Sequence, residues 1–314
     1  MAEIKVFGLL NSKKIAKEIA DQLGIEVGKL STEKFSDTEM TVFYEETIRK
    51  REIYLVASTN SPEAIIELVL AIDAAKRAGV KSVNVIMTYY GYARQDRRDH
   101  HRGSISAKAL ATVIESVGMD SMITIDLHAN QIEGFFSKPV IHLQGSLIFI
   151  PYLKNIVNSE EYAICSPDQG GSKRATEFSD KLHLPFVMMN KRRDGPGVVK
   201  SMDLVGDVKG KKVIIIDDLI DSGGSLSKAV DVLIANGAVE VSACITHPVL
   251  SGKAFENINS SKLMKLYVAD TISVENRIIS DKIEVVPCSQ VLGKIIARIN
   301  KKQSIVSLSE SLTI

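Results

Sequence analysis

Two adjacent carboxylates and a small, glycine-containing loop make up the segment of this sequence best suited to chemistry. In KKVIIIDDLIDSGGS (211–225) an apolar run ends at Asp217 and Asp218. The loop that follows consists of Asp221, Ser222, Gly223, Gly224 and Ser225. Glycine N–H groups at the start of a helix bind phosphate, because the helix dipole favours negative charge there. Neighbouring carboxylates accept strong hydrogen bonds from vicinal sugar hydroxyls. The pattern predicts a sugar-phosphate site; the alternative is an acidic turn that caps a helix.

Two basic segments are suited to binding further phosphates. GYARQDRRDHHRG (91–103) holds four arginines within nine residues: Arg94, Arg97, Arg98 and Arg102. MMNKRRDGPG (188–197) places a second basic cluster before two glycines, namely Lys191, Arg192 and Arg193. Both follow apolar runs of strand length, and guanidinium groups bind phosphate oxygens in a bidentate manner. Each segment taken alone could also be a solvated basic loop, since charge runs usually face water.

Apolar runs of strand length alternate with helical patterns along the chain, and these elements must position the polar segments. Strands are expected at 5–7, 52–58, 82–87, 122–127, 161–166, 186–190, 211–218 and 240–246. Apolar spacing of about 3.6 residues predicts helices at 64–79, 105–118, 172–182 and 225–237. This alternation indicates an α/β fold with mostly parallel sheets flanked by crossover helices. Ligands of such sheets bind beyond the carboxyl ends of the strands, where the polar segments lie.

The two halves of the chain follow the same scheme. IYLVASTNSPEAIIEL in the first half corresponds to YAICSPDQGGSKRATEF in the second, and MITIDLHANQ corresponds to VIIIDDLIDS. We therefore expect two similar α/β domains, 1–146 and 147–314, although two unrelated α/β halves could give the same pattern. The polar tail SLSESLTI (307–314) is either a frayed end or an interface strand that packs back on the N-terminal domain.

Composition and charge exclude several classes of protein. The 314 residues suffice for two domains, and a net charge of +1 gives no bulk attraction to nucleic acid or to a membrane. No apolar run reaches the length of about 18 residues that a membrane span needs. The N-terminal stretch lacks the pattern of a signal peptide, and the three cysteines have no metal-type spacing. We expect a cytoplasmic protein with buried thiols.

Four stretches carry a resemblance to a known family over nearly the full chain. They are FSDTE (35–39), GYARQDRRDHHRGSISAK (91–108), DLHANQIEGFF (126–136) and SPDQGGSKRA (166–175). Together with the segment at 211–225, they resemble the ribose-phosphate diphosphokinase (PRPP synthase) family, for which DLHxxQIxGFF is close to diagnostic. The resemblance implies two tandem phosphoribosyltransferase-like domains, the first with ATP-binding motifs and the second with a ribose 5-phosphate loop. It also implies transfer of the β,γ-diphosphoryl group of MgATP to the 1-hydroxyl of ribose 5-phosphate, which feeds nucleotide biosynthesis.

The resemblance assigns binding roles to individual residues. It implies ATP contacts from Phe35, Asp37, Glu39, Arg94, Gln95, Asp99 and His128. Phe35 would stack on the adenine from a neighbouring subunit, and the two nearby carboxylates would accept from the adenine amino group. The ribose 5-phosphate loop would comprise Asp217, Asp218, Asp221, Ser222, Gly223, Gly224 and Ser225. Thr38 stands where the family has glycine, which leaves the backbone conformation of that turn open.

Metal and catalytic roles follow from the same resemblance. It implies that His128 and Asp168 lie at Mg²⁺, whose remaining ligands would be phosphate oxygens and water. Asp126 could instead orient His128. Lys191 and Arg193 would be catalytic residues on a flexible loop that closes over the reacting phosphates. A general base is not identified, although the paired carboxylates of the sugar loop could polarise a hydroxyl.

Two alternatives to a synthase stay open. A phosphoribosyltransferase would need one such domain, and it would need neither DLHxxQIxGFF nor the YARQD segment. A catalytically silent homologue that regulates synthase subunits is the second alternative, and the departures at Thr38, Ser222 and Gly223 keep it open. The DGPG run at 194–197 also departs from the family, so the length or stiffness of that loop is expected to differ.

Two further expectations concern the assembly of the protein and the roles of one pair of basic residues. The resemblance implies a homo-oligomer, a hexamer built from dimers, with ATP and ribose 5-phosphate as its small-molecule partners. Lys173 and Arg174 open the expected helix at 172–182, and they either contact ribose 5-phosphate or face water.

Overall fold

The computed structural model describes residues 4–158, 160–193, 199–274 and 280–307, without the side chains of 191–193 and 199–202. The described chain divides into two compact units. Unit 1 comprises 4–144, 271–273 and 288–306, and unit 2 comprises the remainder. Each unit has its own sheet and its own hydrophobic core, so the two are described separately.

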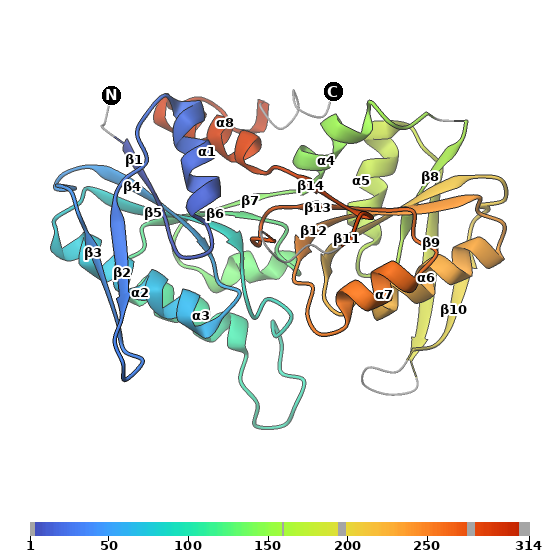
Figure 1. Ribbon diagram of the computed structural model, residues 1–314, viewed down its shortest axis with the longest axis horizontal. Helices are drawn as coiled ribbons and strands as arrows, with labels where there is room; N and C mark the ends of the chain where they lie inside the picture. The colour runs from blue at the N-terminus through green and yellow to red at the C-terminus, as the bar shows by residue number, and fades with distance from the viewer. Residues whose placement is uncertain (1–3, 159, 194–198, 275–279, 308–314) are drawn as a thin grey trace. The chain divides into compact units, whose positions relative to one another are not determined.

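Unit 1 is built on a parallel sheet with the strand order β1-β4-β5-β6-β7 (Figure 1). These strands are β1 (Ile4–Gly8), β4 (Glu52–Ser58), β5 (Ser82–Tyr89), β6 (Ser121–Ile125) and β7 (Val140–Leu143). Every neighbouring pair is parallel. The strands are nearly continuously apolar and buried because helices cover both faces, as is usual for parallel sheets.

The helices of unit 1 come from both ends of the chain. They are α1 (Lys13–Leu23), α2 (Pro62–Arg77), α3 (Ser106–Ser116) and α8 (Ser289–Asn300). Figure 1 shows α1 and α8 on one face of the sheet and α2 and α3 on the other. Helices α1 and α8 approach closely at Gly293, where a Cβ would lie 2.4 Å from Gln22 Oε1. The C-terminal helix therefore belongs to unit 1.

Local signals explain where α2 begins and ends. Ser61 Oγ accepts a hydrogen bond from the Ala64 N–H (3.2 Å), and Pro62 occupies the first helical position. A serine N-cap and a proline at this position are both favoured, because the first N–H groups of a helix lack partners within it. After the helix the chain turns at Gly79, which has a φ of +75° that favours glycine.

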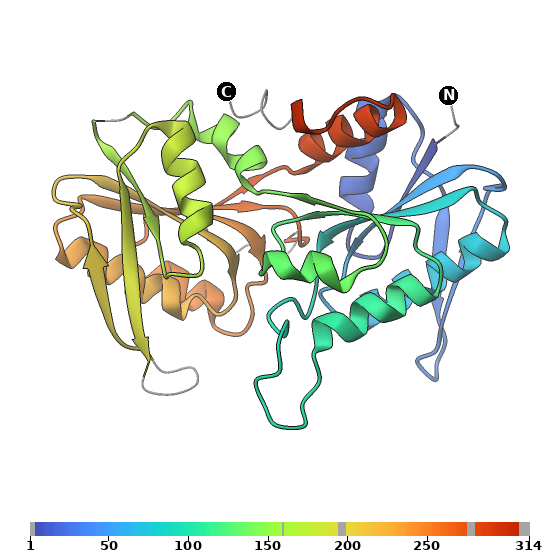
Figure 2. The same ribbon diagram turned by 180° about the vertical axis from the view of Figure 1, so that it is seen from behind.

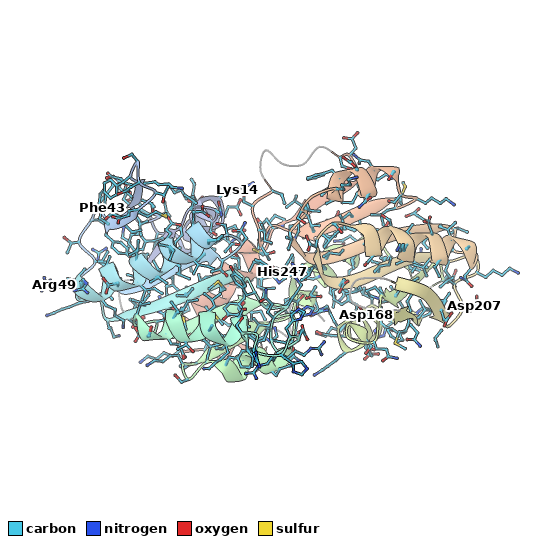
Figure 3. All side chains as sticks on the ribbon, turned by 90° about the horizontal axis from the view of Figure 1, so that it is seen from below. Lys14, Phe43, Arg49, Asp168, Asp207 and His247 are labelled. Atoms are coloured by element: carbon cyan, nitrogen blue, oxygen red, sulfur yellow. The ribbon has the colours of Figure 1, made fainter. Side chains whose placement is uncertain are left out.

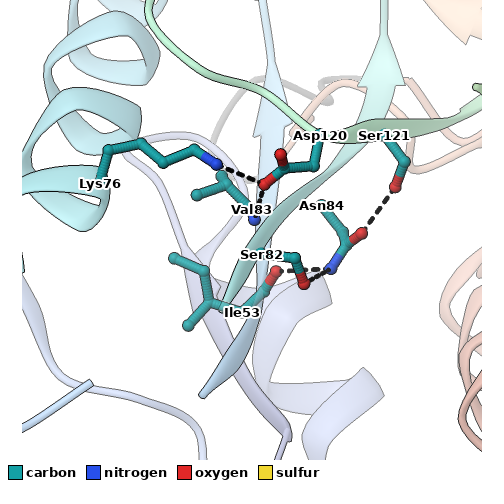
Figure 4. Close-up of polar contacts among 7 residues, drawn as sticks. All are labelled: Ile53, Lys76, Ser82, Val83, Asn84, Asp120 and Ser121. Carbon is teal, nitrogen blue, oxygen red and sulfur yellow. Dashed lines mark hydrogen bonds and ion pairs between the residues drawn. The ribbon is translucent and has the colours of Figure 1, made fainter. Parts of the chain in front are cut away.

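Asp120 joins α2 to the amino ends of two strands (Figure 4). Its carboxylate lies 2.6 Å from Lys76 Nζ and accepts from the Val83 N–H at 2.7 Å. Beside it, Ser121 Oγ donates to Asn84 Oδ1 at 2.6 Å. These contacts fix the register of β5 and β6 at the edge opposite to their carboxyl ends, so the carboxyl edge is left to carry polar loops.

A two-stranded antiparallel hairpin projects from unit 1. It consists of β2 (Leu30–Lys34) and β3 (Met40–Tyr44), and Figure 1 shows it beside α2. Glu67 of α2 is buried and accepts hydrogen bonds from the Leu10 N–H (2.8 Å) and from Thr32 Oγ1. A buried carboxylate requires such donors, so Glu67 anchors the base of the hairpin.

Unit 2 is built on a seven-stranded sheet with the order β10-β9-β8-β11-β12-β13-β14. The strands are β8 (Tyr162–Ser166), β9 (Phe186–Arg193), β10 (Val199–Val205), β11 (Lys212–Ile220), β12 (Glu240–Pro248), β13 (Lys265–Ala269) and β14 (Ile283–Val286). All pairs are parallel except β9 and β10, which are antiparallel. The longest described strands, β11 and β12, lie at the centre of the sheet and carry the polar ends discussed below.

Helices cover both faces of the unit 2 sheet as well. Figures 1 and 2 show α4 (Ser146–Leu153) and α5 (Ser172–Leu182) on one face. Helices α6 (Gly224–Ala235) and α7 (Ala254–Ser260) lie on the other face. None of the described helices combines the length and the apolarity that crossing a membrane requires.

The predicted α/β fold with mostly parallel sheets is confirmed. The differences are elements that were not predicted, such as α1 and α8, and shifts at element ends. Strand β11 continues to Ile220, two residues beyond its predicted end at Asp218, so Asp217 and Asp218 lie within the strand and are not its last residues. Strand β6 ends at Ile125, two residues before the predicted end, because Asp126 takes a left-handed φ of +39°. The sequence predicted two contiguous domains that meet at 146. In the structure the chain instead returns to unit 1 for α8. The prediction for the tail concerns 308–314, outside the described residues.

Candidate active site

Two polar segments leave the carboxyl edge of the unit 1 sheet, one after β5 and one after β6. Gly91 begins the first segment, and a Cβ at this position would lie 2.0 Å from Thr59 O. The Gly91 N–H donates to Thr59 Oγ1 at 2.7 Å. Glycine is therefore required for the close approach of two loops that follow neighbouring strands. This contact could not be predicted from the sequence, because a lone glycine gives no sign of what lies opposite it.

The predicted ATP residues of the first segment lie on the surface of unit 1. Arg94, Gln95 and Asp99 are all exposed. Ser106 Oγ donates to Gln95 Oε1 at 2.7 Å, and Arg97 Nε lies 3.1 Å from Asp99 Oδ1. An exposed ion pair of this kind contributes about 0–1 kcal/mol. A phosphate anion could therefore compete for these guanidinium groups at little cost.

The second segment presents His128 from a short loop. His128 is exposed, whereas Leu127 before it and Ile132 after it are buried in the core of unit 1. The loop continues into a 3-10 helix at Asn130–Phe135. Gln131 Nε2 donates to Asp96 Oδ2 at 2.9 Å, which joins the two segments to each other. The predicted nucleotide residues of both segments thus belong to one hydrogen-bonded edge of unit 1.

FSDTE forms the turn of the β2–β3 hairpin, and Phe35 is 52% exposed there. The Phe35 N–H donates to Glu39 O (2.8 Å), and the Thr38 N–H donates to Phe35 O (3.0 Å). The Glu39 N–H donates to Asp37 Oδ1 at 3.1 Å, so the carboxylate itself shapes the turn. Thr38 has a φ of +78°, which answers the question that the sequence left open. The turn keeps a backbone conformation that favours glycine, although a β-branched residue occupies it.

Unit 2 gathers charged side chains at the carboxyl end of β11. Asp218 is buried, and Arg174 Nη1 lies 3.6 Å from its Oδ1. Burial raises the pKa of Asp217 well above its usual value, and the adjacent Asp218 carboxylate raises the pKa further. Asp168 acts in the same direction, while Arg174 opposes the shift. Arg174 therefore faces the carboxylates, whereas Lys173 beside it is exposed to solvent.

One backbone conformation and two side-chain hydrogen bonds shape the loop that follows β11. Gly223 has a φ of +76° and precedes α6, for which it provides no side-chain cap. Asn257 Nδ2 donates to Ser222 O at 2.8 Å, and Ser251 Oγ donates to Asp221 Oδ1. Gly224 and Ser225 were predicted in the loop and are the first two residues of α6. The first N–H groups of α6 therefore point toward any anion at this end.

Asp168 lies in the turn between β8 and α5, and Figure 3 labels it together with His247. Its Oδ1 accepts from the Gly171 N–H (3.1 Å), and its carbonyl oxygen accepts from Ser166 Oγ (2.7 Å). His247 is buried at the end of β12, opposite Leu219 of β11. No role could be predicted for His247, because a single histidine after a strand has no recognisable spacing.

The basic segment at 188–197 is described in part. The backbone of Lys191 and Arg193 belongs to β9, in register with Met202 and Val199 of β10. Strand β9 thus extends beyond its predicted end at 190. The side chains of Lys191 and Arg193 and the DGPG run lie outside the described part of the chain. Their predicted catalytic roles stay predictions.

A magnesium ion would have to rely on few protein ligands. Among the described residues, no three His, Cys, Asp or Glu side chains are grouped closely enough to hold a metal ion unaided. Mg²⁺ commonly takes one or two carboxylates and completes its shell with phosphate oxygens and water. The mutual repulsion of the carboxylates near Asp217 would be relieved by a cation bound with a substrate phosphate. The residues present therefore fit Mg²⁺ held jointly with a phosphate ligand.

These two α/β units, with polar loops beyond the carboxyl ends of their parallel strands, define a class of tandem phosphoribosyltransferase-like proteins. A solved structure supports this class over the whole chain. The crystal structure of phosphoribosylpyrophosphate synthetase from Mycobacterium smegmatis is similar with a TM-score of 0.89 and 29% identity. The similarity covers 96% of this chain and 99% of that one.

Sequence comparisons identify the family within this class. Residues 4–118 match the N-terminal domain of ribose phosphate pyrophosphokinase, and residues 193–309 match the phosphoribosyl synthetase-associated domain. The ribose-phosphate pyrophosphokinase of Oceanobacillus iheyensis is 43% identical over 97% of this chain and 96% of its own length. That of Bacillus subtilis is 42% identical over 96% of both chains. The chain belongs to the ribose-phosphate pyrophosphokinase family, as its sequence motifs predicted.

The comparisons also bear on the first alternative. A phosphoribosyltransferase with one such domain would not account for similarity that extends over nearly the full length of synthases. The predicted enzyme class, a kinase-type diphosphotransferase, is therefore confirmed.

Proposed function

We propose that this protein transfers the β,γ-diphosphoryl group of MgATP to the 1-hydroxyl of ribose 5-phosphate, which yields 5-phosphoribosyl 1-diphosphate and AMP. The product is a precursor for nucleotide biosynthesis. The observation that carries the proposal is the arrangement at the end of β11, where two carboxylates precede a glycine-capped helix, in a chain of this family. Carboxylates in this position accept hydrogen bonds from sugar hydroxyls, and the N–H groups at the start of the helix bind a phosphate.

Ribose 5-phosphate is assigned to unit 2. The N–H groups at the start of α6, with Ser222 and Ser225, would bind the 5-phosphate. Asp217 and Asp218 would accept hydrogen bonds from the ribose hydroxyls. Arg174 holds Asp218 in place through their 3.6 Å contact. Asp221 would be fixed by its hydrogen bond from Ser251 and would shape the loop.

MgATP is assigned to unit 1. Arg94, Gln95 and Asp99 would contact the nucleotide, and their exposure on the β5–α3 loop supports that role. The FSDTE turn, with Phe35, Asp37 and Glu39, would bind adenine in a second subunit. Half-exposed Phe35 offers a face for stacking, which a buried core residue would not.

Mg²⁺ would be held by His128 and Asp168 together with phosphate oxygens. When bound, the ion neutralises charge that develops on the phosphoryl oxygens. The protein's own part is to position the ribose 1-hydroxyl in line with the β-phosphorus, so that AMP leaves as the new bond forms. Lys191 and Arg193 would stabilise the transferring group, since phosphoryl transfer depends mostly on positioning and charge neutralisation. No covalent enzyme intermediate is required.

We further propose a cytoplasmic homo-oligomer, a hexamer assembled from dimers. Sharing of the adenine site between two subunits would make the dimer the smallest active unit. The cytoplasm is supported by the three cysteines, which are all buried and reduced, as is common in a reducing compartment.

The proposal is tested by measuring AMP release from MgATP with and without ribose 5-phosphate. We expect AMP to form when both substrates are present, at a rate that depends on the sugar phosphate. The same assay with a ribose 5-phosphate analogue that lacks the 1-hydroxyl is the control and should give no AMP. A purified, folded protein that binds both substrates and releases no AMP would instead be the silent regulatory homologue.

A further inference from the structure

His142 lies behind the loop that presents His128. It belongs to β7, and its side chain is 4% exposed. Its Nε2 accepts a hydrogen bond from the Leu127 N–H at 2.9 Å. Its Nδ1 lies 2.5 Å from Glu133 Oε1. The imidazole therefore touches the chain on both sides of His128.

These two contacts fix the protonation of the ring. A backbone N–H can only donate, so His142 Nε2 must carry a lone pair and no proton. The proton of the neutral ring is then on Nδ1, which donates it to the Glu133 carboxylate. Glu133 thus selects the tautomer that can accept from Leu127, as outer carboxylates do for histidines that must present one particular nitrogen.

Buried side chains also restrict the conformation of the loop that carries His128. Leu127, Ile132 and Phe136 are buried in the core of unit 1. Asp126, directly before Leu127, has a left-handed φ of +39°, a conformation that needs support from its surroundings. The hydrogen bond to the Leu127 N–H provides support next to this residue, while exposed His128 follows immediately.

We propose that His142 is a positioning residue for His128, acting through the Leu127 N–H, with Glu133 as the residue that selects its tautomer. The inference rests on the proposed function, in which His128 meets the Mg²⁺ and phosphates of ATP. His142 touches no substrate. It holds the backbone that carries His128, so its loss displaces a group needed in the transition state more than one needed for nucleotide binding.

Two amide substitutions separate the two contacts. The amide of glutamine can place an acceptor oxygen near the position of His142 Nε2, whereas that of asparagine reaches the position of Nδ1. His142→Gln therefore keeps an acceptor for Leu127, and His142→Asn keeps a donor for Glu133. We expect His142→Asn to lower kcat by about 10-fold to 100-fold, the usual effect of losing an outer-shell partner. The KM for MgATP should change little, and His142→Gln should restore most of kcat.

Glu133 offers a second route that leaves the buried position intact. Its side chain is 43% exposed, so its replacement does not open the core. Glu133→Gln keeps an acceptor for Nδ1 and should behave like the wild type. Glu133→Ala removes the carboxylate that selects the tautomer of His142. Part of the population then adopts the other tautomer and loses the acceptor for Leu127. We therefore expect kcat to fall, but by less than in His142→Asn.

Amide hydrogen exchange gives a readout that does not depend on activity. We expect the Leu127 amide to exchange faster in His142→Asn and Glu133→Ala than in the wild type and in both glutamine variants. Equal kcat losses in His142→Asn and His142→Gln, in step with a lowered Tm, would overturn the proposal in favour of packing alone. Unchanged kcat in His142→Asn would also overturn it. An inactive wild type would contradict the proposed function instead, while the exchange pattern would still decide whether the Leu127 contact exists.

Discussion

At the scale of single residues, the FSDTE turn carries strain that substitution can remove. Thr38 has a φ of +78°, and a left-handed conformation costs a non-glycine residue about 1–2 kcal/mol. Thr38→Gly removes this cost in the folded state. It also raises the conformational entropy of the unfolded chain, which offsets about 0.5–1 kcal/mol of the gain. We expect a net gain of about 0.5 kcal/mol in the free energy of unfolding, measured by urea denaturation. Ser36→Gly, in the same turn without positive φ, should lower that free energy. A loss of stability in Thr38→Gly would show that the strain is absent.

The raised pKa of Asp217 predicts a dependence of stability on pH. A carboxyl whose pKa is higher in the folded than in the unfolded state binds protons better when folded. Its contribution is present below the unfolded pKa and is lost as the pH rises through the folded pKa. Asp217→Asn cannot ionise, so its advantage over the wild type in free energy of unfolding should grow as the pH rises.

Urea denaturation in metal-free buffer from about pH 5 to about pH 8 measures this difference. Asp231→Asn is the matched control, because Asp231 is an exposed carboxylate on α6. It should show no gain that grows with pH. A pH-independent difference for Asp217→Asn would contradict the raised pKa of Asp217 beside Asp218.

At the scale of elements, the start of α6 depends on one backbone conformation. Gly223 has a φ of +76°, so any side chain there is strained even though a Cβ would have room at 3.5 Å from its nearest neighbour, Ala254 O. Gly223→Ala should lower the free energy of unfolding by about 1–2 kcal/mol and weaken ribose 5-phosphate binding. Gly224→Ala is the matched control for stability, because Gly224 lies within the helix, where alanine is favoured.

Stability is read from urea denaturation and binding from calorimetric titration with ribose 5-phosphate. A Gly223→Ala protein as stable as Gly224→Ala would mean that the loop adopts another conformation. Loss of MgATP binding equal to the loss of sugar-phosphate binding would mean that the substitution damages the fold as a whole.

The elements themselves were largely predictable from sequence. Helix 172–182 and strand 52–58 were predicted with their observed bounds, because the helix has a clear helical period and the strand is a short, continuous apolar run. The predicted end of β11 at Asp218 was two residues too early, since the pair of carboxylates was taken to end a strand that in fact continues to Ile220. Helices α1 and α8 were not predicted. The sequence does contain their pattern, because apolar residues recur at helical spacing, such as Ile15 and Ile19 in α1 and Val291 and Ile295 in α8. Gly293, which allows α1 and α8 to approach, resembles a helix break when only the sequence is considered.

The candidate site stands out in the sequence by its residue types, whereas its contacts do not. Asp217, Asp218 and the glycine loop stand out because two adjacent carboxylates followed at this spacing by a pair of glycines are an unusual pattern. The contacts from Gly91 to Thr59 and from Leu127 to His142 join residues far apart in sequence, so no local pattern announces them. Arg174 illustrates the limit: its sequence position allowed two orientations, and the fold of unit 2 selects the one that faces Asp218.

At the scale of the whole molecule, the proposed sharing of the adenine site between subunits predicts complementation between inactive chains. Phe35→Ala and His128→Ala should each be inactive. If each site takes its FSDTE turn from one subunit and His128 from another, random exchange gives about a quarter of the sites neither lesion. Mixing the two variants should therefore restore part of the activity, measured as AMP release.

Native mass spectrometry of the mixture establishes that subunits exchange, and each variant incubated alone is the control. A mixture that exchanges subunits and stays as inactive as its parents would show that Phe35 and His128 are not combined from different chains in one site.

The proposed function requires that the diphosphoryl group, and not a single phosphoryl group, moves to the 1-hydroxyl of ribose 5-phosphate. Phosphorus-31 NMR of the protein with MgATP and ribose 5-phosphate distinguishes the two transfers, because it identifies every product. We predict that AMP and a sugar 1-diphosphate accumulate in equal amounts while the 5-phosphate resonance is retained. Formation of ADP with a sugar bisphosphate, or release of orthophosphate without a sugar diphosphate, would contradict the account.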